Sequence, residues 1–63
     1  MLKVGTLIRV IYPQYAAGVQ GRIQAREESG RWIVKLEENP INWSNEPILL
    51  SLDESDFEVI DPN

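Results

Sequence analysis

The stretch Val19-Gln-Gly-Arg-Ile-Gln-Ala-Arg26 alternates apolar or small residues with polar ones over its whole length. In an extended strand, one face would carry Val19, Gly21, Ile23 and Ala25, and the polar residues would face the other way. No other part of the chain has so clean a period of two. Because a glycine weakens the middle of a flat strand, Gly21 predicts a bulge, a tight bend or a close approach of another backbone.

Strands are also predicted on both sides of this stretch. They span residues 6–12, 31–37 and 48–52, and a short terminal strand contains Phe57 and Val59. Segments rich in turn-forming residues separate the strands, at 13–18, 27–30, 38–47 and 53–55. The turn at 27–30 is a hairpin in which Gly30 can adopt a positive φ.

Five short strands without a helical period predict a single all-β domain over residues 1–63. A chain of this length cannot cover both faces of an open sheet, whereas a strongly bent five-stranded barrel buries one face of every strand. The sequence therefore predicts a small closed or nearly closed barrel. Ten side chains are expected in its core: Ile8, Val10, Val19, Ile23, Trp32, Val34, Leu36, Leu50, Phe57 and Val59.

The chain contains neither cysteine nor histidine. Their absence excludes disulfide bonds, the common zinc sites and the usual catalytic bases and nucleophiles. The acidic residues at 53–58 lack the glycine-centred spacing of a calcium loop. We therefore expect no metal, no cofactor and no enzymatic activity. No apolar run approaches the roughly 20 residues of a membrane span, so we expect a cytoplasmic protein, or one peripheral to the cytoplasmic side of a membrane complex.

Charge is unevenly distributed along the sequence. Residues 1–35 contain all six basic residues and two acidic ones, a net charge of +4, whereas residues 36–63 contain eight acidic residues and no basic one. The outward faces of the first three strands carry five cations: Arg9, Arg22, Arg26, Arg31 and Lys35. These cations would form a basic surface able to dock an acidic protein or a phosphate backbone. The alternative is a solvated face, paired with Glu27, Glu28, Glu37 and Glu38.

Three aromatic residues fall outside the expected core, in or beside loops: Tyr12, Tyr15 and Trp43. Aromatic side chains bury much area with few rotatable bonds and are therefore good anchors for a partner. Alternatively, the two tyrosines pack across one end of the barrel, and Trp43 folds back as a lid on the core.

Three segments resemble the KOW-type opening of an SH3-like barrel: Val4-Gly-Thr-Leu-Ile-Arg-Val-Ile11, Tyr15-Ala-Ala-Gly-Val-Gln-Gly-Arg-Ile23 and Trp32-Ile-Val-Lys-Leu36. In that pattern a glycine precedes the first strand, and a Gly-X-X-Gly-X-aliphatic step bends the second strand over the first. Four residues match it: Gly5, Gly18, Gly21 and Ile23. The resemblance implies a five-stranded SH3-like barrel.

The ending Leu52-Asp-Glu-Ser-Asp-Phe-Glu-Val59 is similar to that of small photosynthetic accessory barrels. These include photosystem I reaction-centre subunit IV, the variable chain of ferredoxin-thioredoxin reductase and the S subunit of the photosynthetic NDH-1 complex. In these proteins the barrel is a non-catalytic adaptor that docks on a larger complex, and some members help to engage ferredoxin.

The sequence therefore predicts a non-catalytic protein-binding or accessory module on a larger, photosynthetic or electron-transfer complex. Its docking residues would be Arg9, Arg22, Arg26 and Arg31, with Tyr15 and Trp43 as loop anchors. One alternative is a KOW-like domain that binds RNA or a ribonucleoprotein, although a net charge of −4 opposes a polyanion. Another is a structural subunit that buries Ile33 and Leu49 by self-association. The sequence does not fix the oligomeric state.

Overall fold

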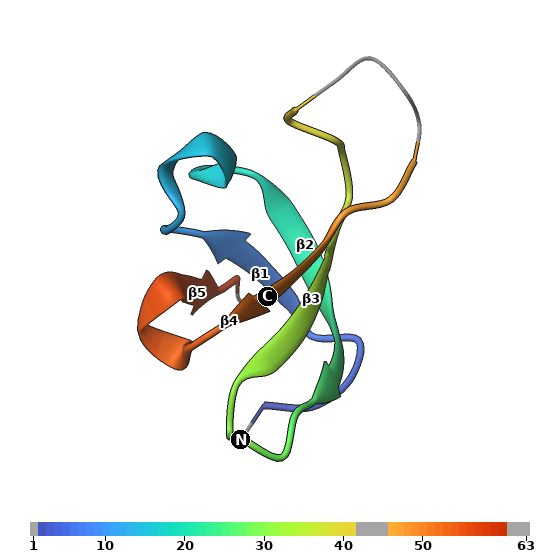
Figure 1. The fold of residues 1–63 in the computed structure, drawn as a ribbon, viewed down its shortest axis with the longest axis vertical. Helices are drawn as coiled ribbons and strands as arrows, with labels where there is room; N and C mark the ends of the chain where they lie inside the picture. The colour runs from blue at the N-terminus through green and yellow to red at the C-terminus, as the bar shows by residue number, and fades with distance from the viewer. Residues whose placement is uncertain (1, 42–45, 61–63) are drawn as a thin grey trace.

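The alternating stretch around Gly21 forms the central strand of a five-stranded sheet in the computed structural model, which describes residues 2–41 and 46–60 (Figure 1). Seven elements follow one another along the chain: β1 (Leu7–Val10), η1 (Gln14–Ala16), β2 (Gln20–Arg26), β3 (Trp32–Leu36), β4 (Leu49–Leu52), η2 (Glu54–Asp56) and β5 (Phe57–Val59). The two η elements are single 3-10 turns. The prediction of one all-β domain is confirmed.

The strands pair in the order β4-β3-β2-β1-β5, and every pairing is antiparallel. β2 and β3 are joined by the predicted hairpin, in which Gly30 has φ 95°. Within residues 2–41 and 46–60 no backbone ladder joins β4 to β5, so the pairing leaves these two strands as the edges of the sheet. β1 is shorter than predicted and ends at Val10; beyond it, the N–H groups of Ile11 and Tyr12 both donate to the carbonyl of Asp56, the residue that precedes β5.

Gly21 lies close against β3 and leaves no room for a side chain. A Cβ atom at this position would lie 2.7 Å from the carbonyl oxygen of Lys35 and 2.9 Å from Cγ1 of Val34. Any larger residue would therefore push the two central strands apart. The predicted close approach of another backbone at Gly21 is confirmed.

The register between β2 and β3 shifts by one residue between Ile23 and Ala25, which makes Gln24 the extra residue of a bulge. Ile23 is buried, whereas the three residues that follow it in β2 are all exposed. The prediction that Ala25 shares the inner face with Ile23 is therefore wrong, because the bulge interrupts the alternation. Beyond it, the guanidinium of Arg26 lies over the ring of Trp32, 4.9 Å from its centroid.

The core is built from one face of all five strands and from one loop residue. Its nine buried members are Ile8, Val10, Ala16, Ile23, Trp32, Val34, Leu36, Leu52 and Phe57. Seven of these were among the ten expected residues, while Val19 and Leu50 are partly buried and pack against the cluster. Ala16 was not expected, and it is buried because η1 folds the 13–18 loop back over one end of the core.

Val59 is the one expected core residue that the structure exposes, with 51% of its surface accessible. It pairs with Ile8 of β1 on one side only, because β5 is an edge strand of three residues. Among the strands that the structure describes, none pairs with the other side of β5, so the expectation that Val59 belongs to the core is wrong.

Over the described ranges the structure contains no helix that is long and apolar enough to cross a membrane.

Candidate functional site

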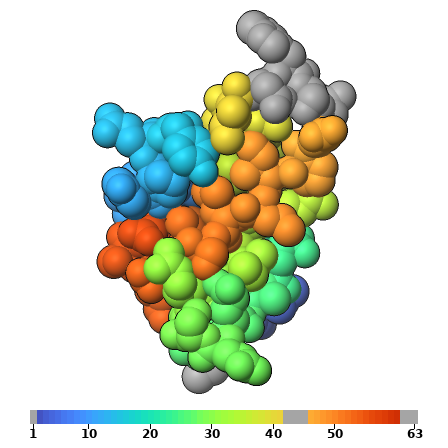
Figure 2. Space-filling model, in the orientation of Figure 1, coloured from blue at the N-terminus to red at the C-terminus, as the bar shows by residue number. Residues whose placement is uncertain are grey.

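Three large apolar residues lie exposed within five positions of one another, between the end of β1 and η1. Ile11 exposes 51% of its surface, Tyr12 64% and Tyr15 53%. We call these three residues the tyrosine surface; the light-blue segment that contains them protrudes from the molecule in Figure 2. Single exposed apolar residues are normal on any protein, but a group that includes two aromatic rings is typical of interaction sites.

Backbone hydrogen bonds fix the segment that carries the tyrosine surface. The N–H groups of Ile11 and Tyr12 both donate to the carbonyl of Asp56, at 2.8 and 3.1 Å. Ala16 N donates to the carbonyl of Pro13 at 3.0 Å within η1, and the buried methyl group of Ala16 anchors this turn to the core. The two tyrosines therefore project from an ordered backbone, which lowers the entropy lost when a partner covers them.

The sequence left two interpretations of Tyr12 and Tyr15, anchors for a partner or packing across one end of the barrel. More than half of the surface of each tyrosine is open, so neither is covered by packing across the end of the sheet. Ile11 was not among the predicted site residues. Its signal in the sequence was its outward position in the first strand, two residues before Pro13, where no neighbouring strand can cover it.

The acidic turn η2 lies directly against this segment, because its Asp56 carbonyl accepts the two N–H groups of Ile11 and Tyr12. η2 is closed by a capping box in which Asp53 N donates to the Asp56 carboxylate at 3.1 Å. The carboxylate of Glu54, on the same turn, has no hydrogen-bond or ion-pair partner among the residues that the structure describes. The turn that binds the backbone of the tyrosine surface therefore carries an exposed carboxylate with no partner in the described part of the chain.

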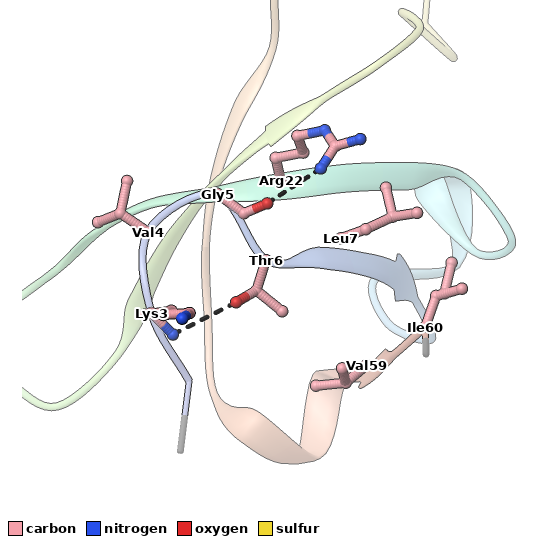
Figure 3. Close-up of a pocket in the computed structure, with 8 residues that line it drawn as sticks. All are labelled: Lys3, Val4, Gly5, Thr6, Leu7, Arg22, Val59 and Ile60. Atoms are coloured by element: carbon pink, nitrogen blue, oxygen red, sulfur yellow. Dashed lines mark hydrogen bonds between the residues drawn. The ribbon is translucent and has the colours of Figure 1, made fainter. Parts of the chain in front are cut away.

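A second feature is a groove of about 430 Å³ between the N-terminal segment and β5 (Figure 3). Its apolar lining comes from Val4, Leu7, Val59 and Ile60. Arg22 crosses one side of the groove and donates to the carbonyl of Gly5 at 3.0 Å. The described residues that line this groove include no carboxylate.

The arginines of the first strands are paired with acids from distant parts of the chain. Arg9 Nη1 lies 3.0 Å from Glu58 Oε1, across the β1–β5 pair. Arg22 Nε lies 3.7 Å from Glu37 Oε2. Four glutamates were weighed as partners of the basic residues, and only Glu37 forms such an ion pair within the described ranges.

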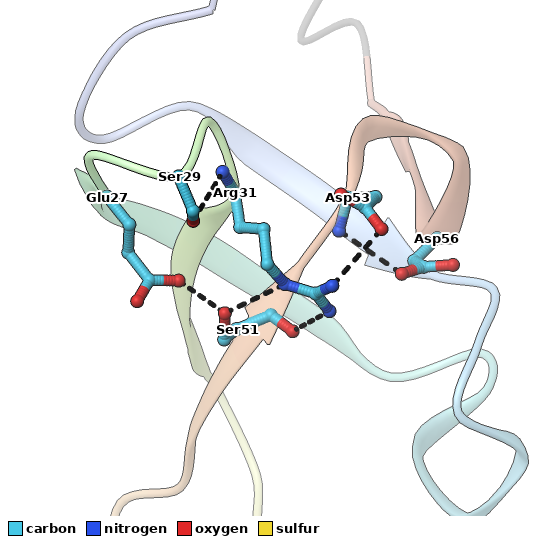
Figure 4. Close-up of polar contacts among 6 residues, drawn as sticks. All are labelled: Glu27, Ser29, Arg31, Ser51, Asp53 and Asp56. Atoms are coloured by element: carbon cyan, nitrogen blue, oxygen red, sulfur yellow. Dashed lines mark hydrogen bonds and ion pairs between the residues drawn. The ribbon is translucent and has the colours of Figure 1, made fainter.

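Arg31 makes the most extensive polar contacts of the predicted docking residues (Figure 4). Its guanidinium donates to the carbonyl of Ser51 at 2.8 Å, to the Ser51 hydroxyl at 3.1 Å and to Asp53 Oδ2 at 3.2 Å. The Ser51 hydroxyl also contacts the carboxylate of Glu27. In an antiparallel ladder, successive carbonyls of a strand point alternately toward and away from the partner strand. The Ile48 carbonyl points toward β3, because it accepts the N–H of Leu36, so the Ser51 carbonyl, three residues later, points away from β3. Arg31 therefore covers part of the free edge of β4.

The structure brings some of the predicted basic residues together and separates others. Arg22 and Lys35 are directly opposite each other in the β2–β3 pair, and Arg9 lies on the neighbouring strand β1. Arg26 and Arg31 lie at the hairpin end, beyond the bulge, where one stacks on Trp32 and the other contacts β4. Trp43, the remaining predicted anchor, lies outside the described residues.

No group of three or more acidic side chains that could hold a metal ion occurs in the part of the chain that the structure describes. No protein-family model matches this sequence, and no curated protein or solved structure is significantly similar to it.

Proposed function

We propose that this chain is a non-catalytic protein-binding module, an accessory to a larger complex, and that it binds its partner through the tyrosine surface. The observation that carries the proposal is the exposure of Ile11, Tyr12 and Tyr15 on a backbone held by the bonds to Asp56. Exposed aromatic residues on an ordered backbone are the usual centres of protein interfaces. A photosynthetic or electron-transfer complex is the kind of assembly that the resemblance of the C-terminal segment implies.

We further propose that the five strands form an SH3-like barrel of KOW-type layout. The strand order agrees with this layout, and so does the position of Gly21, which allows β2 to lie closely against β3. Gly18, the preceding glycine of the Gly-X-X-Gly step, has φ 88° and donates its N–H to the carbonyl of Val10, which closes the loop that carries the tyrosines.

The basic residues remain proposed contributors to docking. Arg9, Arg22 and Arg31 would have to exchange their present acidic partners for those of a bound protein, because each is already in an ion pair. Such exposed pairs contribute only about 0–1 kcal/mol each, so this exchange costs little. Alanine at these positions, at Arg26 and at the anchors Tyr15 and Trp43 tests their role; unchanged binding would exclude it.

The test of the proposed function is capture of partner proteins from a native lysate by the tagged domain, followed by quantitative mass spectrometry. Tyr12→Ser and Tyr15→Ser should each reduce captured partner at least five-fold, since a central aromatic anchor contributes about 1–2 kcal/mol or more. Leu49→Ser is the matched control, because Leu49 is 59% exposed and lies on β4, away from the tyrosine surface. Equal capture by all variants would refute the proposal.

Nuclease treatment in the same experiment, and a separate measurement of the domain's mass against its concentration, distinguish two alternative functions. Partners that disappear after nuclease treatment would indicate a KOW-like RNA-binding domain, for which the facing cations Arg22 and Lys35 are the natural contact. A mass that rises with protein concentration and returns to that of the monomer in Leu49→Ser would indicate self-association through β4.

A further inference from the structure

The tyrosine surface lies at a boundary between an uncharged segment and an acidic one. Residues 10–21 contain no charged side chain, whereas residues 53–58 contain four carboxylates and no cation. These segments are far apart in the sequence, and the two hydrogen bonds to the Asp56 carbonyl join them. In Figure 2 the light-blue segment with η1 lies directly above the orange-red segment with η2 and β5. The backbone that carries the tyrosines is therefore held against the acidic segment.

The four carboxylates of this acidic segment are not equally available to a partner. Asp56 accepts a hydrogen bond from Asp53 N, and Asp53 also pairs with Arg31. Glu58 pairs with Arg9 but remains exposed, with 53% of its side chain accessible. Glu54 is exposed and pairs with nothing in the described part of the chain. Glu54 is therefore the carboxylate that a bound cation would meet without breaking an existing contact.

We propose that the partner presents a basic segment, with at least one arginine or lysine between apolar residues, to the tyrosine surface. This inference rests on the proposed function and names the chemistry of the partner at the same site. The cation would stack on a tyrosine ring while its charge lies beside Glu54, and the apolar residues would cover Ile11 and the second ring. The net charge of −4 would attract such a segment over a distance and repel an acidic one.

The test is selection of peptides from a random twelve-residue phage-displayed library on the immobilised domain, repeated on Tyr15→Ser. Peptides retained by the wild type and lost on Tyr15→Ser report on the tyrosine surface alone. Enrichment of arginine or lysine among these peptides supports the inference. If these peptides are neutral or acidic, the inference is overturned while the proposed function stands. If no peptide depends on Tyr15, the proposed function itself is overturned.

The role of Glu54 is measured by titrating the best enriched peptide, carrying a fluorescent label, in an anisotropy assay. Glu54→Gln should weaken binding by roughly two- to five-fold, as expected for one exposed charge contact. Glu28→Gln is the matched control, because Glu28 is exposed and unpaired among the described residues but lies in the β2–β3 turn. Equal effects of the two variants would mean that only overall charge matters, which would overturn the placement of the cation beside Glu54.

Discussion

Substituting Gly21→Ala tests the close approach of β2 and β3 at this glycine. The added methyl group would lie 2.7 Å from the Lys35 carbonyl oxygen, 2.9 Å from Val34 Cγ1 and 3.3 Å from Leu36 Cα. Overpacking of this kind costs about 1–3 kcal/mol, and the lower entropy of the unfolded alanine variant offsets about 0.4–1 kcal/mol of it. We therefore expect a net loss of about 1–2 kcal/mol in the free energy of unfolding.

For a domain of this size, that loss corresponds to a decrease in Tm of about 5–15 °C. Thermal and urea unfolding followed by circular dichroism would measure it. Gln24→Ala is the matched control, because it changes an exposed residue of the same strand and should stay within about 0.5 kcal/mol of the wild type. If Gly21→Ala proved as stable as this control, β2 and β3 would not lie as close together as the structure shows.

Three further substitutions test other parts of the fold. Arg31→Ala removes three hydrogen bonds, so we expect the free energy of unfolding, measured by thermal unfolding, to fall by about 1 kcal/mol. The substitution also uncovers the Ser51 carbonyl at the edge of β4, so we expect association that increases with protein concentration in sedimentation experiments. Ile8→Ala should cost about 2–5 kcal/mol in urea unfolding because Ile8 is fully buried, whereas Val59→Ala, opposite it, should stay below about 1 kcal/mol. Asp56→Ala breaks the capping box of η2 and should cost about 0.5–2 kcal/mol, with faster amide exchange in the loop that carries the tyrosines.

The sequence predicts the strands well because each strand of this small sheet has one buried face, and that face sets a period of two. Gly21 is also informative, because a glycine in the middle of a strand is typical of a bulge, a bend or a close backbone approach, and the structure shows the close approach. Two predictions about single residues, Ala25 and Val59, were wrong. The bulge at Gln24 leaves no mark in a regular alternation, and the exposure of Val59 depends on which strand forms the edge, a property of the pairing and not of the residue.

The site was less predictable than the fold, because burial constrains it less. Tyr15 was identified from its place in a loop, but Ile11 looked like an ordinary strand residue until the structure ended β1 at Val10. Ile11 faces outward in the alternation of the strand, and its N–H bonds to Asp56, which joins the end of β1 to a 3-10 turn more than forty residues later in the chain. No local pattern in the sequence encodes such a contact.

Folding brings the acidic half of the sequence into contact with the basic half. Because β5 pairs with β1 and β4 pairs with β3, the acidic C-terminal half returns onto the basic strands, where Glu58 meets Arg9 and Asp53 meets Arg31. Three of the arginines in the basic first half of the sequence, Arg9, Arg22 and Arg31, are therefore paired with acids. The acids outnumber the cations, so negative charge is left over, and part of it lies on η2, whose Asp56 carbonyl binds the backbone of the tyrosine surface. This distribution favours a basic partner at that surface over an acidic one at the strands, and the charge of the peptides that depend on Tyr15 decides between them.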